Sequence, residues 1–100
     1  MKQEKPKSKQ KEKHFVYILE CCDQSLYVGM TKDIERRLFQ HNNLKSGARY
    51  TKTRRPVELK YFERHKTFKD AMLREIEIKR WKRERKLKLL QGFDARKKMG

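Results

Sequence analysis

The sequence predicts a small α+β domain, in which a three-stranded antiparallel or mixed sheet is flanked by helices in the order β-β-α-β-α, with room for an extra C-terminal helix. Three observations predict this fold class. Two β-branched and aromatic runs lie on either side of residues 22–24, a third alternating run begins at Val57, and apolar residues recur at helical spacing after the second and third runs. A chain of 100 residues has room for one such domain with a modest core.

The domain is expected to span residues 14–92. Residues 1–13 are rich in Lys, Gln and Glu, contain Pro6, and carry six Lys against two Glu. Because this segment has nothing apolar to bury, we expect a disordered basic tail there. Residues 93–100 are expected to form a loose basic C-terminal tail.

The first two runs, HFVYILEC at 14–21 and SLYVGM at 25–30, predict a β-hairpin. Side chains alternate across a strand, so Tyr17 and Tyr27 share a face only if the loop has an odd number of residues. We predict an odd loop, of three residues (22–24) or five. Gly29 inside the second strand indicates close approach of another backbone or a ligand, with packing against a helix as the alternative.

A helix is predicted for residues 32–43. Thr31 can cap its N-terminus, Asp33 suits the positive end of the helix dipole, and Ile34 and Leu38 recur at i, i+4.

Residues 43–55 predict a loop, because they contain Gly47 and two nearby Asn and are followed by Pro56. The alternating apolar residues from Val57 to Tyr61 then predict a third strand over residues 57–63.

A second helix is predicted from about residue 68 to 82. Thr67, with Asp70 following at the spacing of a capping box, marks its start. Its apolar residues form one arc on a helical wheel: Phe68, Ala71, Met72, Ile76 and Ile78. Residues 83–91 either extend this helix or form a short second one, with Gly92 as the stop.

Glu75 lies near the centre of that apolar arc. Burying an unpaired carboxylate costs several kcal/mol, so a carboxylate in this position needs a partner. Glu75 is therefore expected either to pair with an Arg or to bind a metal ion.

The chain carries 29 Lys and Arg against 13 Asp and Glu, a formal charge of +16, and residues 14–100 still hold 23 basic and 11 acidic side chains. Nucleic acid is the first candidate partner, because phosphate contacts release counterions and favour such surfaces. A membrane is disfavoured, because no apolar run reaches the roughly 18 residues that span a bilayer and no segment has a strong apolar face. Without an apolar segment suited to a signal peptide, we expect a cytoplasmic protein.

Several short stretches resemble the GIY-YIG nuclease family. Val16, Tyr17 and Ile18, followed ten residues later by Tyr27, Val28 and Gly29, resemble the paired motif that names the family. Residues 31–41, with Arg37 and His41, are similar to its first helix, and residues 71–75, ending in Glu75, to its second. Small stand-alone members share the look of GARYT at 47–51 and RRPVEL at 54–59.

The resemblance implies a Mg²⁺- or Mn²⁺-dependent endonuclease that hydrolyses phosphodiester bonds, with Glu75 holding a single metal ion. Arg37 would grip the phosphate with its guanidinium fork, whereas Arg36 is expected to be a surface charge. Tyr27 would orient or deprotonate the attacking water with support from Tyr17. A phenol has a reference pKa of about 10, so nearby cations must lower it or a second group such as His41, which titrates near neutrality, must accept the proton.

Nucleic acid, DNA rather than RNA, is the expected partner, with no small-molecule cofactor and with room for a protein partner. The residues expected to touch it are Arg49, Tyr50, Lys52, Arg54, Arg55, Lys79 and Lys82. Two departures from the family pattern stand out: Phe15 replaces the Gly of the first motif, and residues 88–91 (KLLQ) replace an Asn that several family nucleases carry. A binding module of the same fold with weak or no catalysis is therefore the alternative.

Overall fold

The computed structural model describes residues 13–45 and 47–93. Apart from Lys13 and Phe93, the two predicted tails lie outside the described residues. The elements follow in the order β1 (His14–Glu20), β2 (Leu26–Thr31), α2 (Ile34–Asn43), α3 (Arg49–Lys52), β3 (Glu58–His65), α4 (Phe68–Arg80) and α5 (Arg83–Leu90). The predicted α+β class is confirmed.

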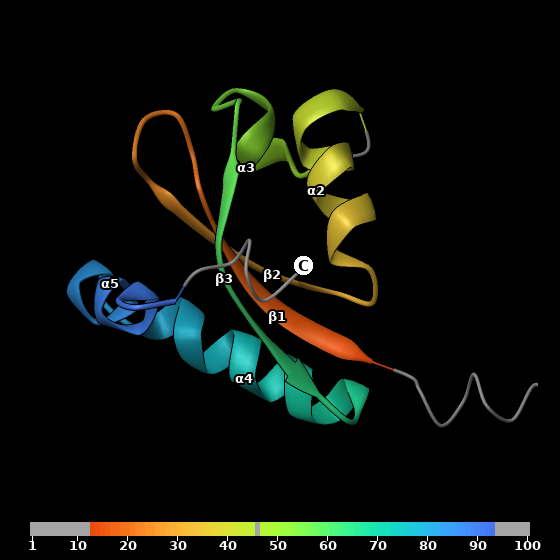
Figure 1. The fold of residues 1–100 in the computed structure, drawn as a ribbon, viewed down its shortest axis with the longest axis vertical. Helices are drawn as coiled ribbons and strands as arrows, with labels where there is room; N and C mark the ends of the chain where they lie inside the picture. Colours follow the sequence, from red (N-terminus) through yellow and green to blue (C-terminus); the bar gives the residue numbers. More distant parts are fainter. Residues whose placement is uncertain (1–12, 46, 94–100) are drawn as a thin grey trace, which may run out of the picture.

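The three strands form one antiparallel sheet in the order β2-β1-β3, with β1 in the centre. Helix α4 runs along one face of this sheet, and α2 and α3 lie on the other (Figure 1). Because β2 and β3 are edge strands, residues from the two helical layers can approach each other around an edge of the sheet.

Alternation along β1 divides the core into two clusters. The cluster on the α4 face consists of Val16, Ile18, Val28, Ala71 and Ile78. The cluster on the opposite face consists of Tyr17, Leu19, Cys21 and Val57, with Tyr27 and Leu38 among the residues packed against it. The two tyrosines therefore lie on the face that carries α2 and α3.

The hairpin loop sets this arrangement. Glu20 pairs with Leu26, which leaves five residues between the strands, so the predicted odd loop is confirmed. The Cys21 N–H donates to the Ser25 carbonyl (2.9 Å), and the Gln24 N–H donates to the Cys21 carbonyl (2.8 Å). Gln24 has a φ of 72°, the left-handed conformation that follows the turn in such tight hairpin loops.

Helix α2 begins two residues later than predicted. Asp33 is the N-cap and accepts from the Arg36 N–H (3.1 Å), so the prediction that Thr31 caps the helix is wrong. Thr31 instead accepts from the Asp33 N–H (3.1 Å). A carboxylate at the cap satisfies a free N–H and also interacts favourably with the helix dipole.

Helix α4 begins as predicted, with Thr67 accepting from the Asp70 N–H (3.0 Å). It ends at Arg80, because Trp81 and Lys82 have extended backbone, and α5 is therefore a separate helix. Gly92, just past its end, has a φ of 76°, as expected of a glycine that stops a helix.

The inward face of α4 is narrower than the predicted apolar arc. Ala71 and Ile78 are fully buried, but Phe68 is 57% exposed and Ile76 is 39% exposed. The stripe that faces the sheet therefore runs through Ala71, Glu75 and Ile78, at i, i+4 and i+7. Glu75 keeps its central place on this face.

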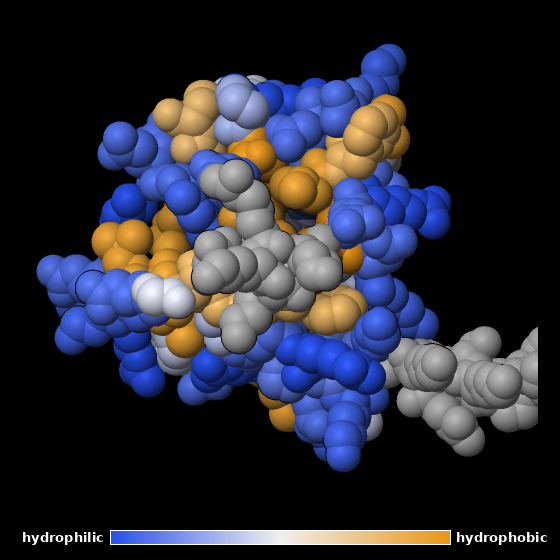
Figure 2. All heavy atoms as spheres, in the orientation of Figure 1, coloured by the Kyte–Doolittle hydropathy of each residue, from blue (hydrophilic) through white to orange (hydrophobic). Residues whose placement is uncertain are grey.

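Figure 2 shows that hydrophilic side chains cover most of one face of the molecule, with patches of hydrophobic side chains among them. Within residues 13–45 and 47–93, every helix is too short or too polar to cross a bilayer.

Candidate active site

Tyr17 lies in β1 directly opposite Gly29 of β2. A Cβ added to Gly29 would lie 2.6 Å from the Tyr17 hydroxyl oxygen, closer than side-chain contacts allow. Gly29 is thus needed for the Tyr17 ring to lie across β2. Within the protein, the predicted close approach is made by this side chain and not by another backbone or a helix.

The Tyr17 hydroxyl begins a buried chain of hydrogen bonds. Its oxygen lies 2.9 Å from Nε2 of His41, and Nδ1 of His41 lies 2.8 Å from the Thr51 hydroxyl. Thr51 in turn donates to the Ala48 carbonyl (3.0 Å). Both His41 and Thr51 are fully buried, so water does not compete for these bonds.

The direction of these hydrogen bonds follows from the bond between the Thr51 hydroxyl and the Ala48 carbonyl. A carbonyl only accepts, so the Thr51 hydroxyl proton points to Ala48, and Thr51 must accept from Nδ1–H of His41. Nε2 is then the bare nitrogen that accepts the Tyr17 proton. This tautomer is assigned from the hydrogen-bond network.

Burial, together with the charges of Arg37 and Arg55, lowers the pKa of His41 to about 4. The ring is therefore neutral at physiological pH, and the expectation that it titrates near neutrality is wrong. A neutral ring can hold the Tyr17 hydroxyl in place, but its buried position separates it from bulk water.

Burial, and next the neighbouring Tyr27, raises the pKa of Tyr17 to about 12. Tyr17 therefore keeps its proton and donates it to His41. Of the two phenols in the motif, Tyr17 acts as a fixed hydrogen-bonding group.

Tyr27 occupies the outer part of the same face and is half-buried. Its ring centroid lies 5.2 Å from that of His41 and 6.4 Å from that of Tyr17. On its other side it stacks on Tyr50 of α3, with centroids 6.1 Å apart and planes 24° apart. Tyr27 is thus the phenol of the pair that borders solvent.

Arg37 projects from α2 towards this cluster. Its charge lowers the pKa of both Tyr17 and His41, and its Nη1 donates to Gln40 Oε1 (2.8 Å). Arg36, one position earlier, is exposed, as expected from its place on the helix.

Glu75 approaches from the opposite face of the sheet. Its side chain is 17% exposed, and its negative charge contributes to the raised pKa of Tyr17, so its field reaches the tyrosine cluster. The partner is Lys79, whose Nζ lies 3.3 Å from Oε2, one helical turn along α4. The predicted alternative of an arginine partner is therefore wrong.

The residues around Glu75 fit a metal ion held by a single carboxylate. Within the described part of the chain, no three His, Cys, Asp or Glu side chains cluster as a metal cage. Mg²⁺ is commonly held by one or two carboxylates, with water and substrate phosphate as its other ligands. The Lys79 side chain is 53% exposed, and surface ion pairs of this kind are weak, so the ammonium competes little with a divalent ion.

A family model described as the GIY-YIG catalytic domain matches residues 13–88. This chain belongs to the GIY-YIG family. A UPF0213 protein of Staphylococcus epidermidis is 55% identical over 80% of this chain and 96% of the relative, and one of Staphylococcus saprophyticus is 53% identical over 79% and 95%. A solution NMR structure of a UPF0213 protein from Bacillus halodurans has a TM-score of 0.53 and 39% identity, covering 83% of this chain and 89% of that one.

The GIY-YIG match makes this a chain of a nuclease family, so the location of the other predicted nucleic-acid contacts matters. Arg49 and Lys52 are exposed on α3, and Lys82 is exposed just before α5. Arg55, by contrast, donates to the carbonyls of His41 and Leu44, where it stabilises the C-terminal end of α2. Such cationic groups suit the unpaired carbonyls of a helix end.

Arg54 and Tyr50 form a unit. The Arg54 guanidinium lies 3.9 Å from the Tyr50 ring centroid, and its Nε donates to Asp23 of the hairpin loop (3.1 Å). A second nitrogen of the guanidinium, Nη1, donates to the Tyr50 carbonyl (2.9 Å). Arg54 thus holds Tyr50 beside Tyr27.

Sequence reasoning missed the role of Thr51. It lies in α3, a helix of four residues inside the segment predicted as a loop, and no periodic pattern identifies it. One feature could have found it: a His with a fixed role needs a partner for its second ring nitrogen, and GARYT supplies a hydroxyl nearby.

Proposed function

We propose that this protein is a divalent-metal-dependent endonuclease that hydrolyses phosphodiester bonds of DNA by a single-metal mechanism. The observation that carries the proposal is the convergence of Tyr17, Tyr27 and His41 on one face of the sheet, with the charge of Glu75 reaching Tyr17 from α4. They are among the residues that the sequence resemblance to the GIY-YIG family predicts for its active site.

In this proposal Tyr27 orients or deprotonates the attacking water, since it is the phenol beside solvent. Tyr17 is held by His41 and keeps Tyr27 in position through their ring contact. Arg37 contacts the non-bridging oxygens of the phosphate, because a guanidinium fork matches phosphate geometry.

Glu75 would hold one Mg²⁺ or Mn²⁺ ion after Lys79 has moved away. The chemistry that such an ion supplies is neutralisation of the charge that develops on the phosphate. The released Lys79 ammonium would remain beside the substrate and contact a neighbouring phosphate.

A direct test incubates the purified protein with plasmid, branched and single-stranded DNA in Mg²⁺, in Mn²⁺ and in EDTA. We expect cleavage in either metal and none in EDTA. Tyr27→Phe should slow cleavage by about 10²- to 10⁴-fold, the contribution of a group that handles the nucleophile's proton. Tyr61→Phe, which changes a tyrosine on the other face of the sheet, is the matched control.

A second candidate is a nucleic-acid-binding module without catalysis. The Lys79 ammonium on Glu75 favours it, because a lysine already neutralises the carboxylate. In that case DNA would bind in a salt-dependent manner, and no metal would produce cleavage above that of a Tyr27→Phe preparation.

A further inference from the structure

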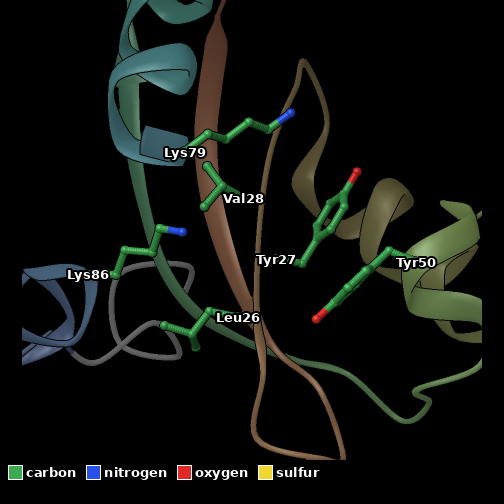
Figure 3. Close-up of a pocket in the computed structure, with 6 residues that line it drawn as sticks. All are labelled: Leu26, Tyr27, Val28, Tyr50, Lys79 and Lys86. Atoms are coloured by element: carbon green, nitrogen blue, oxygen red, sulfur yellow. The ribbon is translucent and has the colours of Figure 1, made fainter. Parts of the chain in front are cut away.

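A shallow pocket of about 250 Å³ lies around the free edge of β2. Tyr27 and Tyr50 form one of its walls, Lys79 of α4 and Lys86 of α5 reach in from the other side, and Leu26 and Val28 lie between them (Figure 3). This juxtaposition joins the two helical layers around the edge strand.

The tyrosine wall is exposed but fixed. Tyr50 is 38% exposed, yet it stacks on Tyr27 and carries the Arg54 guanidinium on its ring. Arg54 is itself bound to Asp23. An exposed aromatic wall that is already ordered can receive a flat apolar ligand at little cost in side-chain entropy.

The lysine wall has the opposite character. Two ammonium groups favour phosphates, which Lys79 and Lys86 can contact from two different helices. An anion alone would make no favourable apolar contact with the tyrosines, Leu26 and Val28. An apolar ligand alone would make no ionic contact with the lysines.

We propose that this pocket binds one unpaired nucleotide of the substrate strand, with the base against the tyrosines and the flanking phosphates on the two lysines. The bases of a duplex are stacked on each other and cannot reach aromatic side chains, whereas bases of single strands, loops and ends can. The pocket is smaller than the roughly 300–1,000 Å³ of typical ligand sites, so it suits a single base and not a base pair.

This inference rests on the proposed function, because Tyr27 and Lys79 border both the pocket and the cleavage site. It adds a substrate class to that function: DNA with an unpaired nucleotide next to the bond that is cut.

The test measures binding in EDTA, where no cleavage occurs, by fluorescence anisotropy at about physiological salt. The probes are a labelled single strand of mixed sequence and the blunt duplex of the same sequence. We expect the single strand to bind more tightly. Tyr50→Leu should weaken single-strand binding about tenfold, equivalent to about 1.4 kcal/mol for one stacked base, and leave duplex binding within twofold.

Further variants separate the contributions of the Tyr50 ring and of the Lys86 charge. Tyr50→Phe retains the ring and should retain the preference for the single strand. Lys86→Met should weaken single-strand binding more than Lys69→Met, which removes the same charge near the far end of α4. Circular dichroism confirms that each variant is folded.

Equal affinity for both probes, or equal losses for both in Tyr50→Leu, would overturn the pocket assignment. Cleavage of blunt duplex by the wild-type protein would then leave the proposed nuclease function standing. A clear single-strand preference without cleavage in any metal would overturn the nuclease function and leave the pocket.

Discussion

At the scale of single residues, Thr51 determines which ring nitrogen of His41 carries the proton. Its hydroxyl proton is used by Ala48, so it can only accept from His41, and His41 can only accept from Tyr17. The buried Thr51 therefore determines the direction in which the Tyr17 hydroxyl donates, although two hydrogen bonds separate the two residues. Outer hydrogen bonds of this kind fix the ring orientation of histidines in many functional sites.

Thr51→Val should remove the partner of His41 Nδ1 and leave that buried ring nitrogen unpaired, at a cost of about 1–3 kcal/mol in unfolding free energy. Nitrogen NMR of the His41 ring should then show loss of the Nδ1–H tautomer. Thr51→Ser keeps the hydroxyl and should restore it. An unchanged tautomer in Thr51→Val would contradict the assigned direction of the chain.

His41 should also make stability depend on pH. Its pKa is lowered from 6.5 to about 4 on folding, so between these values the unfolded chain takes up a proton that the folded protein does not. The unfolding free energy should therefore decrease as the pH falls through this window. Urea denaturation at several pH values measures this decrease, which should be smaller in His41→Gln; equal slopes would argue against a neutral buried ring.

Lys79 acts as a competing cation at Glu75. If a divalent ion must displace the Lys79 ammonium, Lys79→Met should tighten Mn²⁺ binding about two- to fivefold. This factor corresponds to the free energy of a partly exposed ion pair. Lys86→Met removes the same charge from the same pocket without touching Glu75 and is the control. Equal effects of the two variants would show that only the overall charge matters. Calorimetric titration measures both affinities without DNA.

At the scale of the elements, the β1–β2 hairpin positions the site. Its odd loop puts Tyr17 and Tyr27 on one face, and the missing side chain at Gly29 lets the Tyr17 ring cross β2. The edge position of β2 then brings α4, with Glu75, around to the same region.

Gly29→Ala should lower the unfolding free energy by about 1–3 kcal/mol, the usual cost of overpacking, because its Cβ would overlap the Tyr17 ring. In a Tyr17→Leu background the same substitution should cost much less, since the ring is gone. Chemical denaturation of the four proteins of this cycle measures the coupling. The same cost in both backgrounds would mean that strand propensity, and not the Tyr17 ring, explains Gly29.

How far the sequence predicts these elements depends on whether local patterns determine them. The hairpin, β3 and the start of α4 follow from alternation and capping residues, and the structure confirms them. The sequence left open whether residues 83–91 extend α4 or form a second helix, because residues 81 and 82 contain neither Gly nor Pro to mark a break. The structure shows the second helix. Between the two helices, Trp81 packs against the core cluster on the α4 face, a tertiary contact that overrides local propensity, and the guanidinium groups of Arg74 and Arg85 lie over its ring.

For the candidate site, likewise, the sequence predicts the residues but not the contacts between them. The family resemblance puts forward Tyr17, Tyr27, Arg37, His41 and Glu75 as its residues. Their pairings depend on long-range packing: Lys79 rather than an arginine beside Glu75, and Thr51 behind His41. No periodic pattern in the sequence predicts such contacts.

At the scale of the whole molecule, the charge of +16 should dominate nucleic-acid binding. If four cations near the site, Arg37, Arg49, Lys52 and Lys86, each neutralise a phosphate of a single strand, log K should fall with log[salt] with a slope of about −3 or steeper. Lys86→Met should reduce the magnitude of the slope by about 0.7. Anisotropy titrations at a series of NaCl concentrations measure it, and a slope near zero would rule out binding through phosphates.

In the proposed mechanism, Glu75 alone among the carboxylates of α4 supports divalent-dependent cleavage. Glu75→Gln and Glu77→Gln remove the same charge two positions apart on one helix, and Glu77 is exposed and paired with Arg74. The deciding measurement is the single-turnover rate of DNA cleavage in Mg²⁺ for both variants. We predict a loss of more than about 100-fold for Glu75→Gln and less than about threefold for Glu77→Gln, because loss of a direct metal ligand exceeds that of an outer one. Equal rates in the two variants would mean that Glu75 does not hold the metal ion.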